Sequence, residues 1–177
     1  SLHDALPICF NVLIAPFKPN GKPLHVHGFK GAFNKAADAN TRMLQEFTSS
    51  GIPMIGIDPS MTLTYRQEYV DDGTRLKIEV QLLQEWLVKH CDLLNLKAAD
   101  LPQNSYKLMA HCSEKTSAAA SMADWKKIYQ ALGQTLDLQA TGCCGMAGTY
   151  GHETEHYDTS RKIYDLSWAE VVADPAN

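Results

Sequence analysis

The chain has 177 residues, of which 45% are hydrophobic and 20% charged, with a formal net charge of -4 and a pI near 5.9. This length and composition are typical of one globular domain. The charge balance gives no reason to expect a nucleic acid or an anionic membrane surface as a partner, and no apolar run approaches the roughly 20 residues that span a bilayer. We therefore expect neither a nucleic-acid partner nor a membrane span, and the oligomeric state stays unknown.

Short apolar runs alternate with longer amphipathic ones, which is the pattern of strands joined by crossover helices. The predicted fold class is α/β, with an open, mainly parallel sheet that is truncated at both ends. Strands are predicted at residues 10–17, 53–57, 75–80, 106–112 and 136–144. Helices are predicted at residues 29–47, 61–69, 81–94, 118–132 and 158–172. The helix at 61–69 has the clearest start, because Asp58-Pro59-Ser60 offers a capping side chain and a proline for the first turn.

The number of cysteines and the start of the chain bear on the compartment and on the domain boundary. Five cysteines are too few for a disulfide scaffold, and an odd count with one adjacent pair favours a reducing compartment, so we expect a cytoplasmic protein. The opening "SLHDALPI" (1–8) lacks the features of a secretory signal and reads as a translated cloning adaptor. The predicted single domain therefore covers residues 9–177.

Three cysteines end two of the predicted strands. Cys112 ends the strand at 106–112, and the pair Cys143-Cys144 ends the strand at 136–144. Because the carboxyl ends of parallel strands meet at one edge of a sheet, we expect these thiols to lie close together. Thiolates are the ligands that iron–sulfur clusters require, and Gly142 and Gly145 beside the pair would let the backbone approach a cluster and donate N–H groups to it.

The alternative is that these cysteines are buried packing residues. Cysteine is among the most frequently buried residue types. We adopt that interpretation for Cys9 and Cys91, whereas the position of Cys143 and Cys144 between glycines favours a ligand or redox role.

A competing metal site is the segment "HETEH" (152–156), which matches the H-E-x-x-H pattern of zinc proteases. That interpretation needs His152 and His156 one helical turn apart on one face, with Glu153 as general base and a third ligand downstream. The segment is polar throughout, and no histidine follows it. A zinc hydrolase is therefore the minor alternative.

Four other polar residues give weaker signals. His25 and His27 alternate as they would on a strand, although a solvated loop is the favoured explanation for them. Arg66 and Glu68 follow the Asp58 turn and could serve the cysteine site, or could be ordinary surface charges. The sequence leaves both questions open.

Five separated motifs resemble a known family. "HCSEKT" (111–116), "GCCGMAGTYGHE" (142–153) and "SWAEV" (167–171) resemble the C-terminal cysteine-rich, or CCG, domain of large bacterial FAD-linked, iron–sulfur oxidoreductases. "PFKPNGK" (16–22) and "GIDPSMTLTYRQEY" (56–69) resemble the same domain further upstream. Within that family the pattern is most similar to the D-2-hydroxyglutarate dehydrogenase type, with D-lactate oxidising relatives near it.

The resemblance implies a modular enzyme of which this chain is a fragment. An FAD-binding domain would oxidise the 2-hydroxy acid, a ferredoxin-like segment would carry [4Fe-4S] clusters, and this domain would be a further electron-transfer element. The chain would not bind FAD and would not be catalytic alone. Cys112, Cys143 and Cys144 would ligate a cluster of the [4Fe-4S] type. Beside it would lie the cofactor-binding residues His111, Gly142, Gly145 and His152.

Two departures from the family pattern bear on the cluster. The family has a cysteine after Asp-Pro-Ser where this chain has Met61, whose thioether is a weaker ligand than a thiolate. The family also continues past position 177 into a further cysteine-bearing motif. Three thiolates are one fewer than a four-cysteine set, so loss of the cluster from this chain is one expected outcome. The alternative function is a metal-free docking domain of the same enzyme.

Overall fold

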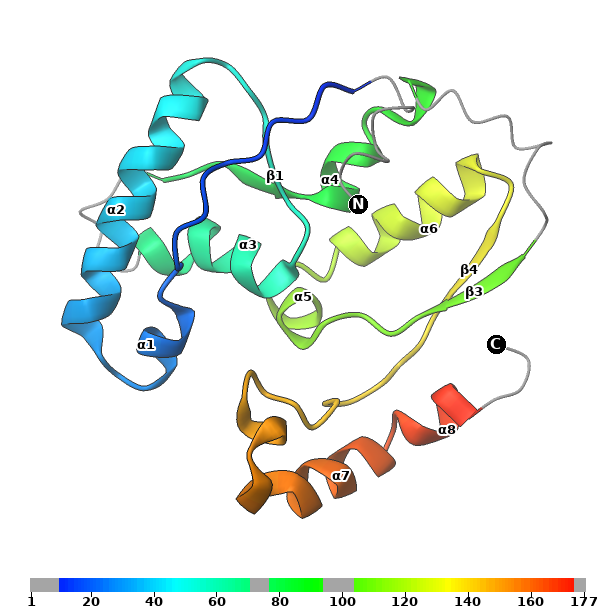
Figure 1. Ribbon diagram of the computed structural model, residues 1–177. Coiled ribbons are helices and arrows are strands. Elements are labelled where there is room, and N and C mark those ends of the chain that lie inside the picture. Colours follow the sequence, from blue (N-terminus) through cyan, green and yellow to red (C-terminus); the bar gives the residue numbers. More distant parts are fainter. Residues whose placement is uncertain (1–9, 71–76, 94–103, 174–177) are drawn as a thin grey trace. The chain divides into compact units, whose positions relative to one another are not determined.

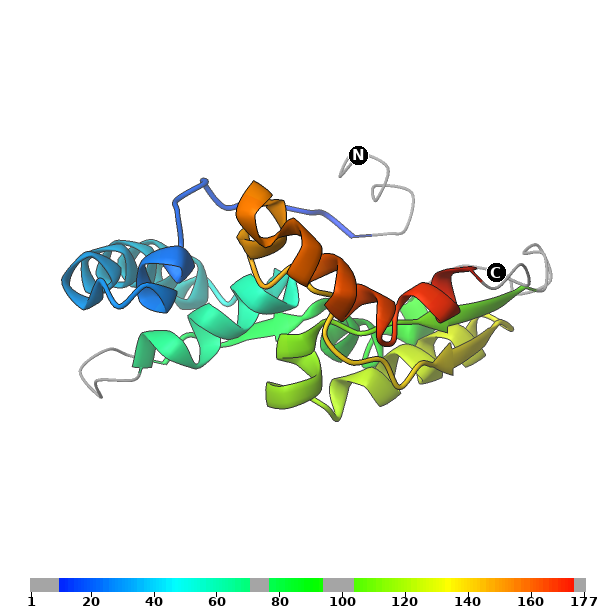
Figure 2. The same ribbon diagram turned by 90° about the horizontal axis from the view of Figure 1, so that it is seen from below.

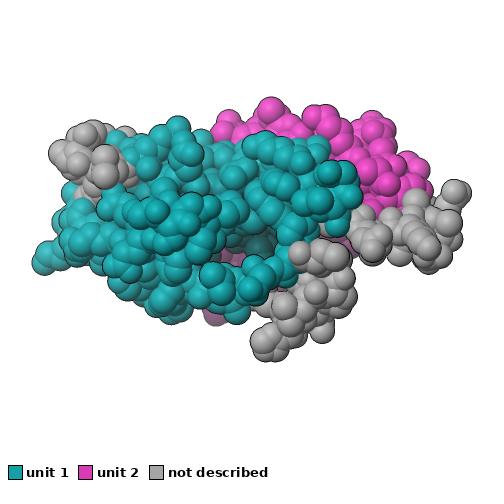
Figure 3. Space-filling model, turned by 90° about the horizontal axis from the view of Figure 1, so that it is seen from above, with its two compact units in different colours: residues 1–100 teal, residues 101–177 magenta. Residues whose placement is uncertain are grey.

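The computed structural model of the chain describes residues 10–70, 77–93 and 104–173. Its contacts divide the chain into two units, residues 1–100 and residues 101–177, which are coloured separately in Figure 3. The segment interpreted as an adaptor, and Cys9, lie outside the described residues. The boundary of one domain at residues 9–177 stays a prediction.

The first unit pairs two short strands and surrounds them with helices (Figure 1). Strand β1 (Met54–Gly56) runs parallel to β2 (Val80–Leu82), with Met54 opposite Val80. The helices and 3-10 turns of this unit are α1 (Lys22–Val26), α2 (Lys30–Ser49), α3 (Pro59–Arg66), η2 (Glu68–Val70), α4 (Leu83–Leu87) and η3 (Cys91–Leu93).

Helix α2 supplies much of the core of this unit. Its apolar residues recur at helical spacing, and Phe33, Ala37 and Leu44 are buried on one face. They pack with Tyr69, Ile78 and Val80 in one cluster. The chain then turns at Gly51, whose φ of 70° lies in the left-handed region that glycine adopts without strain. The predicted helix at 29–47 is therefore confirmed.

Helix α3 begins where its sequence signal predicts. The Asp58 carboxylate accepts a hydrogen bond from the Met61 N–H at 2.7 Å, and Pro59 occupies the first turn. The turn into the helix is tight, because a Cβ placed on Gly56 would lie 1.9 Å from Thr62 Oγ1. The helix ends at Arg66, short of the predicted Tyr69, and the chain continues into η2.

The second unit repeats the strand, helix, strand order. Strand β3 (Ser105–Leu108) runs parallel to β4 (Thr135–Leu138), with Ser105 opposite Thr135, and the two strands lie side by side in both views (Figures 1 and 2). Its helices and 3-10 turns are α5 (Cys112–Ser117), α6 (Ser121–Ala131), η5 (Tyr150–His152), η6 (Thr154–His156), α7 (Tyr157–Asp165) and α8 (Ala169–Ala173).

The α/β class is confirmed by this alternation of helices with parallel strands. In the parts of the chain that the structure describes, the strands form two separate two-stranded sheets in place of one open sheet. No helix in these parts is long and apolar enough to cross a membrane.

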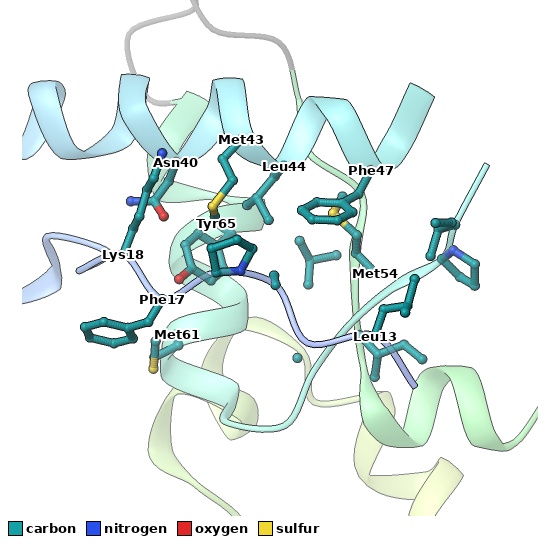
Figure 4. A pocket seen from close by; sticks show the side chains of 17 residues that line it. Leu13, Phe17, Lys18, Asn40, Met43, Leu44, Phe47, Met54, Met61 and Tyr65 are labelled. Atoms are coloured by element: carbon teal, nitrogen blue, oxygen red, sulfur yellow. The ribbon is translucent and has the colours of Figure 1, made fainter. Parts of the chain in front are cut away.

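The predicted strand at residues 10–17 is wrong. These residues are irregular, and Leu13 and Phe17 are 63% and 85% exposed. A strand needs a hydrogen-bonded neighbour, and in the described part of this unit β1 and β2 pair only with each other. The apolar run lies instead along one wall of a pocket, which Leu13 and Phe17 line together with Phe47 of α2 and Met61 of α3, and Phe17 stands beside Met61 (Figure 4).

Several other predicted elements are shorter than expected. The helix at 81–94 starts two residues later, because Val80–Leu82 pair as β2, and it ends at Leu87. The helix at 158–172 is interrupted between Asp165 and Ala169. Strands β3 and β4 end at Leu108 and Leu138, so all three candidate cysteines lie beyond the strand ends.

Candidate functional site

The residues predicted to hold a cluster all lie in the second unit, on the segments that follow β3 and β4. Because these strands are parallel neighbours, both segments leave from the same edge of the sheet. This part of the prediction agrees with the structure, although the strands themselves are shorter.

Cys112 is the first residue of α5, and its side chain is exposed. His111 caps this helix, since its Nδ1 accepts a hydrogen bond from the Ser113 N–H at 3.2 Å. The same Nδ1 lies 4.0 Å from the Cys112 sulfur. The imidazole predicted to assist the site is thus held next to the first candidate ligand.

Cys143 and Cys144 lie in the irregular segment that follows β4, and residues 142–145 of it form the cysteine turn, which neighbouring residues hold closely. Cys143 is exposed and Cys144 is half-buried. The Gly145 N–H donates to the Cys143 sulfur at 3.4 Å, which is the kind of contact expected for a glycine beside a thiolate ligand. Gly145 has a φ of 87°, and a Cβ there would lie 2.3 Å from the Ser160 carbonyl oxygen. The Ser160 hydroxyl in turn donates to the Gly145 carbonyl at 2.9 Å.

The backbone N–H and carbonyl of Gly142 have three side-chain partners. Its N–H donates to Ser167 Oγ at 3.0 Å, and its carbonyl accepts from Trp168 Nε1 at 3.1 Å and from Lys115 Nζ at 3.2 Å. The Lys115 ammonium also donates to the Thr141 carbonyl at 2.6 Å. Lys115 belongs to the motif at 111–116, and Ser167 and Trp168 belong to the motif at 167–171. No local sequence pattern gives these three residues a role, because only the folded chain shows that they meet.

Lys115 also relates Cys112 to the adjacent pair. It stands three residues after Cys112 in α5, and residues at that spacing share one side of a helix. Its bonds to Thr141 and Gly142 therefore bring this side of α5 to the segment just before Cys143. The three sulfurs are not drawn into one tight group, however. Among the residues that the structure describes, the His, Cys, Asp and Glu side chains with ligand atoms mutually within 4.8 Å are Glu153, Glu155 and His156.

The helix that a zinc protease needs is not formed at the HETEH segment. His152 ends η5, Glu153 has an extended backbone, and His156 ends the separate turn η6. The two histidines are therefore not one turn apart on one helical face. His156 instead stacks on Tyr150, with ring centroids 4.0 Å apart, and its Nε2 lies 3.4 Å from a Glu153 carboxylate oxygen. His152 is exposed.

The four weaker candidates lie in the first unit, away in sequence from the cysteine segments. Arg66 donates to Glu85 at 2.7 Å, and Glu68 accepts from both Lys22 and His25, the latter at 2.7 Å. His25 belongs to α1 and also stacks on a core phenylalanine. These contacts account for Arg66, Glu68 and His25 as residues that hold this unit together, and His27 is exposed.

Cys91 differs chemically from the candidate ligands. Burial, together with the neighbouring Asp92 carboxylate, raises the pKa of the Cys91 thiol. Its sulfur donates to the Leu87 carbonyl at 3.2 Å. A thiol held protonated in this way is a poor nucleophile and a poor ligand, which agrees with the structural role expected for it.

The donor set of the second unit fits an iron–sulfur group in its chemistry. It offers three thiols, of which two are exposed, and a backbone N–H already directed at one sulfur. Cys112, Cys143 and Cys144 could hold such a group, with His111 beside the first of them.

Comparison with known proteins gives matches that cover most of the chain. The chain is 50% identical over 159 residues to D-2-hydroxyglutarate dehydrogenase of Pseudomonas putida, a match that covers 89% of this chain and 15% of the relative. It is 38% identical over 168 residues to the enzyme of the same name from Haemophilus influenzae, covering 90% of this chain and 16% of that relative. The chain is homologous to part of the D-2-hydroxyglutarate dehydrogenases. The resemblance expected from the five motifs is therefore confirmed.

A second kind of relative is more distant than the D-2-hydroxyglutarate dehydrogenases. The chain is 30% identical over 159 residues to one component of the anaerobic glycerol-3-phosphate dehydrogenase of Escherichia coli, covering 85% of this chain and 39% of that protein. No family model and no solved structure matches the chain. The chain thus spans about 15% of the length of the D-2-hydroxyglutarate dehydrogenases to which it is similar, and both groups of relatives are named as dehydrogenases.

Proposed function

We propose that this chain is an electron-transfer segment of an FAD-linked 2-hydroxyacid dehydrogenase that oxidises D-2-hydroxyglutarate or D-lactate. In this proposal Cys112, Cys143 and Cys144 ligate an iron–sulfur cluster of the [4Fe-4S] type, and His111 and His152 assist them. The FAD-binding and ferredoxin-like parts of the longer polypeptide are the partners. FAD is bound there and not by this chain, and the enzyme works in the reducing environment of the cytoplasm.

The observation that carries the proposal is the match over nine-tenths of the chain to D-2-hydroxyglutarate dehydrogenases. The placement of the thiols supports it, because Cys112 and the Cys143-Cys144 pair follow neighbouring parallel strands on the same edge. When bound, an iron–sulfur cluster accepts and releases single electrons. The protein would supply thiolates, and the Gly145 N–H would donate to one of them.

A metal-free docking role is the second candidate. The observation in its favour is that the sulfurs of Cys112, Cys143 and Cys144 do not all lie within 4.8 Å of one another in the described part of the chain. In that case the cysteine turn would serve only to hold the second unit against the other parts of the enzyme.

The test is the iron and acid-labile sulfide content of the full chain, purified without oxygen and then reconstituted with iron and sulfide. We expect bound iron and sulfide in similar amounts, with loss of both in Cys143→Ser and in Cys144→Ser. Cys91→Ser is the matched control, because this thiol is protonated and hydrogen-bonded within its own unit.

The same measurements on a longer protein, extended through the segment that follows in the relatives, separate the two candidates. Iron and sulfide in the extended protein alone would mean that the cluster needs a further ligand from that segment. Absence of iron and sulfide from both proteins, the shorter and the extended one, would contradict the cluster and favour the docking role. Zinc without sulfide would contradict it as well.

A further inference from the structure

We propose that Lys115, Ser167 and Trp168 are positioning residues that fix the direction in which Cys143 and Cys144 present their thiols. The inference rests on the proposed function of these thiols as ligands. It concerns residues that come from separate stretches of sequence and meet at the backbone of one residue, Gly142.

The contacts hold both peptide groups that flank the Gly142 Cα. Ser167 Oγ accepts from the amide at 3.0 Å, and Trp168 Nε1 donates to the carbonyl at 3.1 Å. Because an amide and a carbonyl of the same residue are both bonded, rotation about its φ and ψ angles would break at least one bond. The orientation of the next residue, Cys143, follows from this constraint.

Ser167 and Trp168 can reach Gly142 because the last helix of the chain is interrupted. Helix α7 ends at Asp165 and α8 begins at Ala169, so both residues lie in the break between them. A Cβ on Gly142 would lie 3.1 Å from Ser167 Oγ, which shows how closely the two segments approach. The sequence pattern at 158–172 favours one continuous helix, and the break is the departure that places these two side chains at the turn.

Lys115 adds a third bond and a positive charge. Its ammonium donates to the carbonyls of Thr141 at 2.6 Å and Gly142 at 3.2 Å, and Thr141 is buried. Since Lys115 shares a side of α5 with Cys112, it also sets the spacing between the first candidate ligand and the other two. On the far side of the pair, Ser160 holds the Gly145 carbonyl at 2.9 Å. The two cysteines are therefore held at both ends of their turn.

The consequence to be measured is unequal reactivity of two neighbouring thiols. With Gly142 held, Cys143 is exposed and Cys144 is half-buried, so Cys143 should react faster with an alkylating reagent. With Gly142 released, the turn can rotate, and the two rates should approach each other. This measurement needs no bound metal. It is also specific, because loss of a structural contact elsewhere in the chain would not change the ratio of the two alkylation rates.

The experiment is iodoacetamide alkylation of the folded, reduced, full-length chain, with the rates at Cys143 and Cys144 resolved by mass spectrometry. In Trp168→Phe, Ser167→Ala and Lys115→Met we expect the ratio of the Cys143 rate to the Cys144 rate to fall about fivefold, toward equal rates. A factor of about five is the change in conformer populations that corresponds to the loss of one typical hydrogen bond. Lys115→Arg should keep the ratio near that of the unmodified chain, because it retains the charge and the donors.

Two variants on α6 serve as matched controls. Trp125→Phe removes an indole N–H, and Lys126→Met removes an exposed lysine charge, at positions outside the Gly142 contacts. The rate ratio should not change in either. Circular dichroism confirms that each variant is folded before its rates are compared, and Trp168→Phe is the mildest change should another variant fail to fold.

The outcomes distinguish this inference from the proposed function. An unchanged ratio in Trp168→Phe, Ser167→Ala and Lys115→Met would overturn the inference, and so would an equal change in Trp125→Phe. Binding of Co²⁺ gives the second readout, since a thiolate-to-metal absorption band reports the same thiols as ligands. If the unmodified chain binds neither Co²⁺ nor iron and sulfide but the alkylation ratio responds as expected, the ligand function fails while the positioning role stands.

Discussion

At the scale of single residues, the cysteine turn depends on glycines that contact their own chain. The sequence led us to expect Gly142 and Gly145 to make room for a cluster. In the structure their nearest neighbours are Ser167 and Ser160. The residue type was thus a sound signal of close approach, but the partner could not be predicted, because Ser160 and Ser167 are distant in sequence and carry no pattern that names their contacts.

Gly145→Ala should destabilise the protein by more than about 2 kcal/mol. A left-handed backbone costs a residue with a Cβ roughly 1–2 kcal/mol, and here the new Cβ would also lie 2.3 Å from the Ser160 carbonyl oxygen. Gly148→Ala is the control, because Gly148 has a φ of 72° but open space around it. It should show the backbone cost alone. Urea denaturation measures both, and equal losses of stability would contradict this expectation.

At the scale of elements, helices with local start signals were predicted well, and strands less so. The capping residue Asp58 and the periodic apolar face of α2 are encoded within the elements themselves. The apolar run at 10–17 looks like a strand locally, but whether it becomes one depends on a neighbour elsewhere in the chain. In the described residues neither β1 nor β2 pairs with that run, which lies on the surface.

Asp58→Ala should lower the free energy of unfolding by about 1 kcal/mol, the typical cost of removing a helix N-cap. The reason is the 2.7 Å bond from the Met61 N–H to the Asp58 carboxylate, which satisfies an amide that the helix itself leaves unpaired. Asp58→Asn keeps an acceptor at the same place and should lose much less. Thermal denaturation of the three proteins gives the comparison, and similar losses in both variants would count against a capping role.

At the scale of the whole molecule, the class of fold was predictable but the arrangement of strands was not. Alternation of short apolar and longer amphipathic segments predicts α/β, and the structure confirms it. One open sheet was expected, whereas the described strands form two pairs. Strand order is a matter of long-range pairing, and the sequence contains no local signal for it.

Stability of the folded chain should fall at alkaline pH. Burial raises the pKa of the Tyr65 phenol above 10.0, and burial and Asp92 raise that of the Cys91 thiol above 9.0. Both groups are neutral when protonated, so the unfolded chain releases these protons first as the pH rises. Below about pH 9 the two protonated groups therefore make their whole contribution to the free energy of unfolding. It then decreases as the pH passes 9.0 and 10.0, until each group ionises in the folded state.

Denaturation by urea between about pH 8 and pH 11 measures this decrease. The double variant Tyr65→Phe, Cys91→Ser should retain more of its stability at the alkaline end than the unmodified chain. Tyr157→Phe, which removes an exposed phenol, is the control and should follow the unmodified chain. An identical pH dependence in the double variant and the unmodified chain would show that these groups do not govern the alkaline limit.

The tight packing of Gly56 against Thr62 limits which substitutions these two positions can accept. Every missense change of the Gly56 codon adds a Cβ, and that atom would lie 1.9 Å from the hydroxyl of the buried Thr62. Thr62 in turn donates this hydroxyl to the Asp58 carbonyl at 2.6 Å. The new Cβ would also lie 2.9 Å from the Thr62 Cβ. In a library of random variants, substitutions at codon 56 should therefore survive only together with glycine at codon 62, so the two positions are expected to change as a pair.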